Sequence, residues 1–194
     1  MNDKLLKLFT SRVRIKILTL FFTSRKPLYV RQICRAVSEE INAVRRELNR
    51  MHKIGLLKSK PKGNKLFYRL DNMFVFYPEL ARLVVKSTGL GKVIIERSED
   101  LGNITYAMLA LSFCKGRTSS KQEVDVFIVG RVRLRLLKQI MQNAEKEYGR
   151  EVNYSVMTLA EFDFRKKRQD NFIRQVLAQP QVMLIGDEGS FNES

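Results

Sequence analysis

Apolar residues in the first half of the chain recur at helical spacing before they switch to alternation. One amphipathic helix is predicted over about 11–23, and the Lys26-Pro27 pair ends it. A short second helix is predicted to turn the apolar residues at 33, 34 and 37 inward. The third predicted helix has its apolar residues on one stripe: Ile41, Val44, Leu48 and Met51.

The ends of the third helix and the segment after it are also predicted. Ser38 has a hydroxyl that can accept a free backbone N–H, so we expect it to be the N-cap, and Gly55 is expected to close the helix. Beyond Gly55 the period becomes two. Residues 56–60 and 65–70 are predicted strands, joined by the turn sequence Pro61-Lys62-Gly63-Asn64. Three helices followed by a basic hairpin are the order of a winged helix-turn-helix.

The second half of the chain has a different pattern. A helix is predicted over about 74–86, and the Ser87–Gly91 segment is the expected boundary. Strands at 104–111, 124–129, 152–157 and 182–185 alternate with helices at 134–148 and 158–178, the latter opened by the capping box Thr158–Glu161. The expected fold is α+β or α/β. It comprises a winged helix domain (1–73), a linker or dimerisation helix (74–90), a small α/β domain (91–187) and a flexible tail (188–194).

Charge is distributed very unevenly along the chain, whose net charge is +16. Residues 1–88 contain 20 Lys and Arg against 6 Asp and Glu, a net charge of +14, whereas residues 89–194 contain 16 against 14, a net charge of +2. This asymmetry indicates a polyanion-binding module joined to a near-neutral domain. A membrane surface is the competing partner. The sequence has no basic amphipathic helix with exposed aromatics, no apolar run of spanning length and no signal-peptide pattern, so a cytoplasmic protein without a membrane partner is expected.

The polar face of the third predicted helix suits the reading of bases. Arginine pairs bidentately with guanine and asparagine pairs with adenine, while a small residue lets the backbone approach the groove. Basic and polar residues of the hairpin and of the second helix suit phosphates or the minor groove. The alternative is an ordinary solvated helix face. The residues expected to contact DNA are Arg31, Gln32, Ser38, Asn42, Ala43, Arg45, Arg46, Asn49, Lys62, Asn64 and Lys65.

Residues 8–72 resemble the winged helix domain of ArsR-like transcriptional regulators. Residues 41–48 are similar to the recognition helix of that family, and Gly55-Leu56-Leu57 is similar to the start of its wing. The resemblance implies double-stranded DNA as the partner. The metal-sensing cysteine pair of the family is not matched because Cys34 stands alone in the second helix, so no metal is expected. Cys34 and Cys114 are expected to be buried reduced thiols, and His52 to have a structural or surface role.

Residues 112–116 and 123–130 resemble the signature of the nucleotidyltransferase-like fold. In that family Gly-Ser follows the first strand, Asp-x-Asp begins the second, and a third Asp lies on a later strand; the three carboxylates hold two Mg²⁺ ions. Here Leu111 stands at the glycine position, and an asparagine stands at the third carboxylate. The resemblance therefore implies a degenerate motif without catalysis or cofactor. Its residues are Ser112, Glu123, Asp125 and Asn153.

The sequence thus predicts a sequence-specific DNA-binding transcriptional regulator that is not an enzyme. The second domain would serve in sensing or assembly, and a small-molecule or nucleotide effector remains open. The alternatives are an active nucleotidyltransferase that uses the winged helix for targeting, and a non-specific nucleic-acid-binding architectural protein. A homodimer is expected, with packing against the chain's own second domain as the alternative. The apolar residues that suggest it are Phe76, Tyr77, Leu80, Leu83 and Val84.

Overall fold

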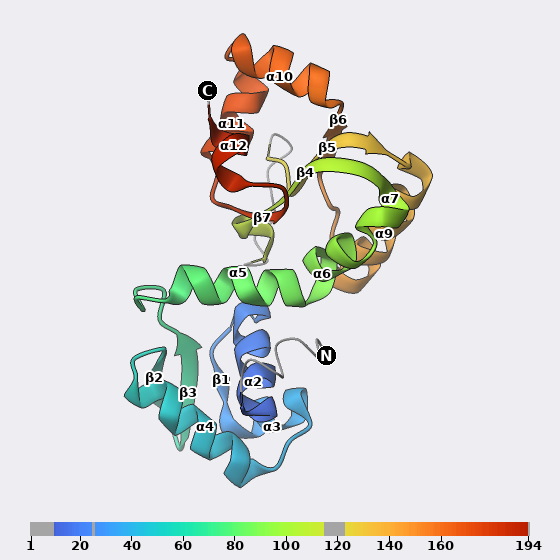
Figure 1. The fold of residues 1–194 in the computed structure, drawn as a ribbon. Coiled ribbons are helices and arrows are strands. Elements are labelled where there is room, and N and C mark those ends of the chain that lie inside the picture. The colour runs from blue at the N-terminus through green and yellow to red at the C-terminus, as the bar shows by residue number, and fades with distance from the viewer. Residues whose placement is uncertain (1–9, 25, 115–122, 194) are drawn as a thin grey trace. The chain divides into compact units, whose positions relative to one another are not determined.

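The protein was analysed as a computed structural model that describes residues 10–24, 26–114 and 123–193. The chain divides into two units, Met1–Thr88 and Gly89–Ser194 (Figure 1). Each unit combines helices with one β-sheet, so the fold is a mixed α+β fold. Among the described residues, no helix is both long and apolar enough to cross a membrane.

The described residues of the first unit form three helices, a three-stranded sheet and a following helix. The sheet has the order β1-β3-β2, with antiparallel pairing throughout. The predicted order of three helices, a hairpin and a further helix is confirmed for this unit, whereas the short strand β1, which pairs with β3, was not predicted. Its elements are α2 (Arg12–Thr23), β1 (Leu28–Tyr29), α3 (Val30–Val37), α4 (Ile41–Lys53), β2 (Leu57–Lys62), β3 (Lys65–Leu70) and α5 (Tyr77–Ser87).

The apolar stripe of α4 lies in the core of this unit. Val44, Leu48 and Met51 are buried together with residues of α2 and α3, such as Ile17 and Ile33. Burial of each such side chain stabilises the fold by roughly 1.5–3 kcal/mol. Since these residues occupy one face of α4, the opposite face of the helix is left to solvent.

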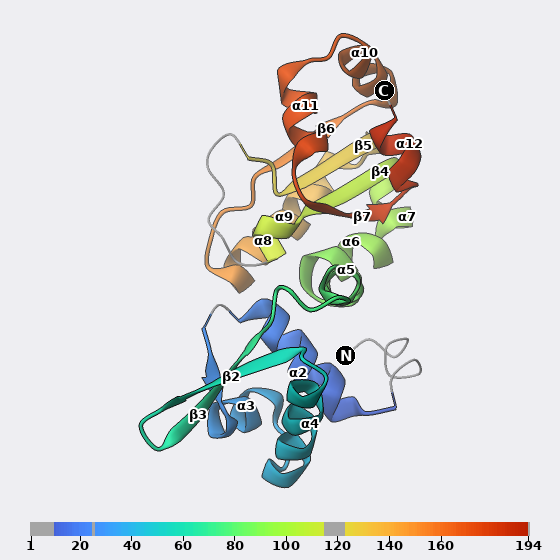
Figure 2. The ribbon, with the colours of Figure 1, turned by 90° about the vertical axis from the view of Figure 1, so that its left-hand side faces the viewer.

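The β2–β3 hairpin turns through two residues, Gly63 and Asn64, so it is tighter than the four-residue turn segment predicted. Gly63 has φ +59°, which favours glycine because the residue has no Cβ. The register places Lys62 opposite Lys65, and Lys60 opposite Phe67. The hairpin reaches beyond the helices of its unit (Figure 2).

The second unit contains a four-stranded sheet of order β6-β5-β4-β7. Strand β4 is antiparallel to both of its neighbours, and only β5 and β6 are parallel. Alternation of strands and helices along the sequence therefore gives a mixed sheet. The elements are α6 (Gly89–Glu96), α7 (Ser98–Leu101), β4 (Gly102–Ala110), α8 (Leu111–Cys114), β5 (Val126–Val132), α9 (Leu134–Tyr148), β6 (Tyr154–Met157), α10 (Leu159–Lys167), α11 (Asn171–Ala178), β7 (Gln181–Ile185) and α12 (Glu188–Asn192).

The single helix expected over 158–178 is two helices in the structure. Gln169 adopts a left-handed conformation with φ +52°, which ends α10. Asp170 then caps α11, since its carboxylate accepts hydrogen bonds from the backbone N–H groups of Phe172 and Ile173. The capping residue Thr158 is confirmed, because its hydroxyl accepts from the N–H of Glu161.

The flexible tail expected over 188–194 was also wrong for its described part. Residues 188–192 form α12, and Phe191 is fully buried. Its ring stacks on Phe162 with centroids 5.3 Å apart and an interplanar angle of 8°. Phe127 and Tyr106 contact the same ring. One aromatic side chain thus anchors the segment to the core of the second unit.

Replacement of Phe191 should therefore destabilise the second unit. We expect Phe191→Ala to lower the free energy of unfolding by about 3–5 kcal/mol, because it leaves a cavity among the stacked rings. Phe164→Ala is the matched control. Because Phe164 is 55% exposed, its replacement should change the free energy of unfolding little. Urea denaturation followed by circular dichroism measures both variants. Equal midpoints for the two variants would contradict the anchoring role.

Candidate nucleic-acid interface

The solvent face of α4 carries the side chains that sequence reasoning assigned to base contacts. Asn42, Arg45, Arg46 and Asn49 are all exposed, and Ala43 between them is half-buried. Their spacing along the helix places these residues within two turns of one another. Among the ion pairs of the described residues, none involves Arg45 or Arg46. Both guanidinium groups can therefore reach a ligand without first breaking an ion pair.

The N-cap of α4 is Glu40 and not Ser38 as predicted. Ser38 has φ +52° and ends α3 in a left-handed conformation. The carboxylate of Glu40 accepts hydrogen bonds from the backbone N–H groups of Asn42 and Ala43, each at 2.9 Å. The bond from Asn42 is the main reason that the pKa of Glu40 lies below its ordinary value. Ser38 is exposed, but it does not cap α4.

The turn between α3 and α4 is held by a lysine of α2. The ammonium group of Lys16 donates a hydrogen bond to the Val37 carbonyl at 2.9 Å and forms an ion pair with the Glu39 carboxylate. The bond from Lys16 is the main reason that the pKa of Glu39 lies below its ordinary value. These contacts join the turn to the first helix of the unit.

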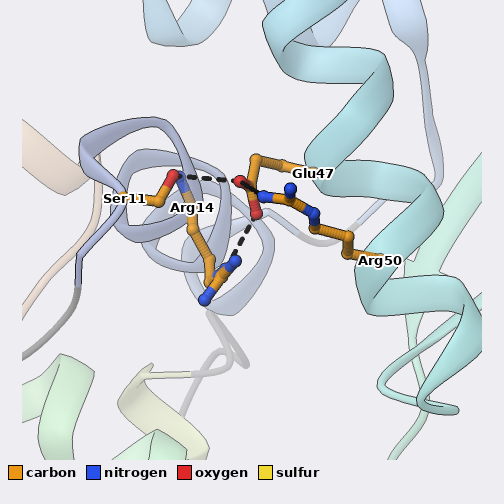
Figure 3. A network of polar contacts seen from close by, with 4 residues as sticks. All are labelled: Ser11, Arg14, Glu47 and Arg50. Carbon is orange, nitrogen blue, oxygen red and sulfur yellow. Dashed lines mark hydrogen bonds and ion pairs between the residues drawn. The ribbon is translucent and has the colours of Figure 1, made fainter.

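A buried carboxylate joins α4 itself to α2 (Figure 3). Glu47 is only 5% exposed and lies on the inner side of α4. Its oxygens accept hydrogen bonds from Arg14 Nε at 2.8 Å, from Arg50 Nη1 at 2.9 Å and from Ser11 Oγ at 3.1 Å. Arg14 and Ser11 come from the start of α2, whereas Arg50 lies one turn further along α4. Sequence reasoning missed this network because its partners are 33 and 36 residues from Glu47.

The pKa of Glu47 is lowered despite its burial. Desolvation by burial raises this pKa, but the hydrogen bonds and the charge of Arg14, together with the bonds from Ser11 and Arg50, outweigh that effect. Glu47 is therefore a carboxylate at neutral pH. The two guanidinium groups compensate its charge, so the buried ion is not left unpaired.

The residues expected at the hairpin and at the second helix lie as follows. Lys62, Asn64 and Lys65 are exposed at the end of the hairpin, and Arg31 is exposed in the first turn of α3. The side chain of Gln32 accepts a hydrogen bond from the Tyr29 backbone N–H at 3.2 Å, so part of its bonding capacity serves the start of α3. The cations on the strands of the hairpin were not predicted as contact residues, although their alternation along the sequence indicates that they share one face.

Those further cations lie on the face of the sheet that is turned away from the helices. Lys58, Lys60 and Arg69 share this face with Lys62 and Lys65, because side chains alternate along a strand. A hollow of about 900 Å³ is lined by four of these cations, Lys58, Lys60, Lys62 and Arg69, together with Lys26, Pro27, His52, Ser59, Pro61 and Phe67. The hydroxyl of Ser59 lies 3.1 Å from Nε2 of His52, which is exposed.

The degenerate motif of the second unit is only partly brought together. Asp125 is 1% exposed, and its Oδ2 accepts a hydrogen bond from the Asn153 backbone N–H at 2.9 Å. Glu123 is exposed and lines, together with Asn153, a hollow of about 520 Å³ that Ser112 does not line. The described residues contain no group of three or more His, Cys, Asp or Glu side chains able to hold a metal ion. The arrangement gives Asp125 a structural task, which is to tie the start of β5 to the segment before β6.

The thiol of Cys34 is half-buried, and its pKa is raised mainly by desolvation. Such a thiol is a poor nucleophile and a poor metal ligand at neutral pH because its thiolate form is disfavoured. The side chain of Cys114 lies outside the described residues.

Comparisons with known proteins correct the expected family resemblances. No family model matches the chain, and no curated protein matches it. Among solved structures, the chain is similar to human N-acetylserotonin methyltransferase in complex with SAM, at 17% identity and a TM-score of 0.31. That similarity covers 52% of this chain and 33% of the methyltransferase chain, so the chain spans about a third of that protein. A TM-score this low carries no argument about fold or function.

The resemblances to ArsR-like regulators and to nucleotidyltransferases were therefore wrong as family assignments. Each rested on runs of fewer than ten residues, and their patterns have physical causes that many unrelated proteins share. An amphipathic helix with Arg and Asn on its free face satisfies the first pattern. A buried strand that begins with acidic residues satisfies the second.

The Glu47 network predicts a specific loss of stability. We expect Glu47→Gln to lower the free energy of unfolding of the first unit by about 1–3 kcal/mol, because two charge-assisted hydrogen bonds are weakened in a buried site. Glu79→Gln removes the same charge from an exposed position of α5 and should change the stability by less than about 0.5 kcal/mol. Chemical denaturation at pH 7 measures the difference. If both variants unfold at the same midpoint, Glu47 does not hold the helices.

The same network predicts a pH dependence. The pKa of Glu47 in the folded protein lies below its ordinary value of 4.5, so the unfolded chain binds the proton more readily. The stabilisation is therefore complete above pH 4.5 and is lost as the pH falls through the lower, folded pKa. The difference in unfolding free energy between wild type and Glu47→Gln should shrink over this acidic range. A difference that is constant from pH 7 to pH 3 would rule out the linkage.

Proposed function

We propose that the first unit is a winged helix-turn-helix that binds double-stranded DNA sequence-specifically, and that the protein is a transcriptional regulator. The observation that carries the proposal is the solvent face of α4, where Asn42, Arg45, Arg46 and Asn49 are exposed on a helix fixed by buried contacts. In this proposal α4 enters the major groove, and the β2–β3 hairpin is the wing.

The dimensions and side chains of α4 support this mode of binding. Its 13 residues give a length of about 20 Å, and the major groove admits one α-helix. Arginine can bond guanine bidentately and asparagine can bond adenine, so the face offers donors and acceptors for both kinds of base pair. Rigid anchoring at Glu47 and Lys16 would preserve the register of these groups against the bases.

Charge supports a nucleic acid as the partner. The net charge of +14 on residues 1–88 attracts a polyanion, and exposed Lys62, Lys65 and Arg31 can contact phosphates on either side of the groove. Phosphate contacts position the protein without selecting a sequence, so the proposal assigns sequence choice to α4 alone.

For the second unit we propose a role in sensing or assembly and no catalysis. Its near-neutral charge gives it little attraction for DNA, and the buried Asp125 serves the backbone of Asn153.

Variants of α4 test the proposal. A DNA site selected from a random duplex pool should bind Arg45→Ala and Arg46→Ala about 1–3 kcal/mol more weakly than wild type, with relaxed preference at the contacted bases. Asp163→Ala offers an exposed control in the second unit and should bind as wild type does. Fluorescence anisotropy at several salt concentrations measures the affinities.

Two outcomes of that experiment would overturn the proposal. If the random pool yields no enriched sequence, the protein is a non-specific nucleic-acid-binding protein instead. If the double variant Arg45→Ala/Arg46→Ala binds a selected site with wild-type affinity and preference, α4 is not the reading helix.

We also propose that two copies bind one operator. A single helix contacts few base pairs, so useful specificity calls for two half-sites about 34 Å apart. Most of the apolar residues of α5 are not available to a second copy. Tyr77 packs on Phe22 within the first unit, Leu80 contacts the same core, and Val84 is buried. Only Phe76 and Leu83 of the five apolar residues remain exposed.

The oligomeric state is measurable directly. Light scattering behind size exclusion should give twice the chain mass of 22.6 kDa for the free protein, or that mass plus the mass of the duplex for its complex with a selected duplex. The selected sequence should then be a palindrome. A monomer in both samples, with a non-repeated site, would contradict dimeric binding.

A further inference from the structure

The outer face of the β1-β3-β2 sheet combines cations with aromatic rings. Lys58, Lys60 and Lys62 of β2 alternate on this face, and Lys65 and Arg69 of β3 lie on the same side. The register pairs Lys62 with Lys65 and Lys58 with Arg69. Like charges directly opposite each other destabilise a sheet. A bound anion would reduce this repulsion.

The charge of this face is mostly uncompensated. Lys58 forms an ion pair with Asp71 at 2.8 Å, and this bond is the main reason that the pKa of Asp71 is lowered. Among the described ion pairs, none involves the other four cations. An acidic ligand would therefore not have to break an ion pair at Lys60, Lys62, Lys65 or Arg69.

Two aromatic rings lie in the middle of these cations. Tyr29 and Phe67 are directly paired in the register of β1 and β3, and their ring centroids are 5.5 Å apart in an edge-to-face arrangement. The ammonium group of Lys65 lies 4.6 Å from the centroid of Tyr29. Both rings are half-buried, and Phe67 lines the hollow of about 900 Å³ together with cations of both strands of the hairpin.

These features point to one class of ligand. Unpaired bases stack on aromatic rings while their phosphates contact surrounding Lys and Arg side chains. In a duplex the bases are already stacked and paired, so a ring within a hollow has no free base to contact. A bilayer is a poorer fit, because half-buried rings cannot insert into lipid as exposed aromatic side chains do.

We propose that the outer face of this sheet binds single-stranded nucleic acid, with Phe67 and Tyr29 stacking on bases and the surrounding cations holding phosphates. This site lies on a different face from α4 and goes beyond the proposed duplex binding, with which it shares only the hairpin cations Lys62 and Lys65. A protein with both sites could contact a duplex and an adjacent unpaired strand.

The test compares single-stranded twelve-mers that carry bases with one that carries none. The full-length protein is titrated into labelled dT12, U12, and an abasic twelve-mer that keeps the phosphates. We expect dT12 or U12 to bind on the order of tenfold more tightly than the abasic strand, which is the effect of stacking about one base. The comparison of dT12 with U12 shows whether the site binds DNA or RNA more tightly.

Variants separate stacking from charge. Phe67→Leu should abolish the preference for base-bearing strands, whereas Leu66→Ala, on the opposite face of the same strand, should keep it. Lys60→Gln should weaken the binding of base-bearing and abasic strands by similar factors. The Arg45→Ala/Arg46→Ala variant should retain single-strand binding, so failure of the duplex proposal would not imply failure of this one.

Crosslinking gives a readout that does not depend on the folding of a variant. A twelve-mer carrying 4-thiothymidine is irradiated with the wild-type protein, and crosslinked peptides are mapped by mass spectrometry. We expect crosslinks on β1 and β3. Crosslinks confined to α4, equal affinities for dT12 and the abasic strand, or binding to phosphatidylserine vesicles without preference for bases would each overturn the proposal.

Discussion

The buried carboxylate of Glu47 is the contact on which the orientation of α4 depends. An apolar stripe alone would let a helix rotate or slide against its neighbours at modest cost, because dispersion contacts have little directionality. Charge-assisted hydrogen bonds from Arg14 and Ser11 do have directionality, and they join α4 to the start of α2. Lys16 adds a second connection from α2 to the turn before α4. The exposed face of α4 is therefore set by contacts on its hidden side.

Local patterns in the sequence were sufficient for most elements of the fold. The stripe of α4, the hairpin with Gly63 and the helix α9 follow from periodicity and turn chemistry, which act over a few residues. Glu47 lies on the buried side of its helix, and periodicity alone treats a charge there as an interruption. Only the fold reveals that Arg14, far away in sequence, makes its burial tolerable.

Other predictions failed for equally local reasons. Ser38 and Glu40 both precede α4 and carry side-chain oxygens that could cap it. Ser38 has a left-handed backbone conformation, and the side chain of Glu40 caps the helix instead. Gln169 is not a residue type that predicts a left-handed break. Phe191 is a single aromatic residue within a polar, glycine-containing segment, so no periodicity indicates that it is buried. In the candidate site, the face of α4 was predictable because it is one helix, whereas the sheet face required the register of three strands.

The cap at Glu40 also determines how α4 can meet an anion. The N-terminus of a helix often holds a phosphate, because its free amides and its dipole favour negative charge. In α4 the carboxylate of Glu40 already bonds the amides of Asn42 and Ala43. A phosphate at this end would find its donors occupied and a like charge beside them. The start of α4 would therefore repel a phosphate, and in the proposed binding mode a polyanion would approach the flank of the helix, which would give the encounter a fixed polarity along the helix axis.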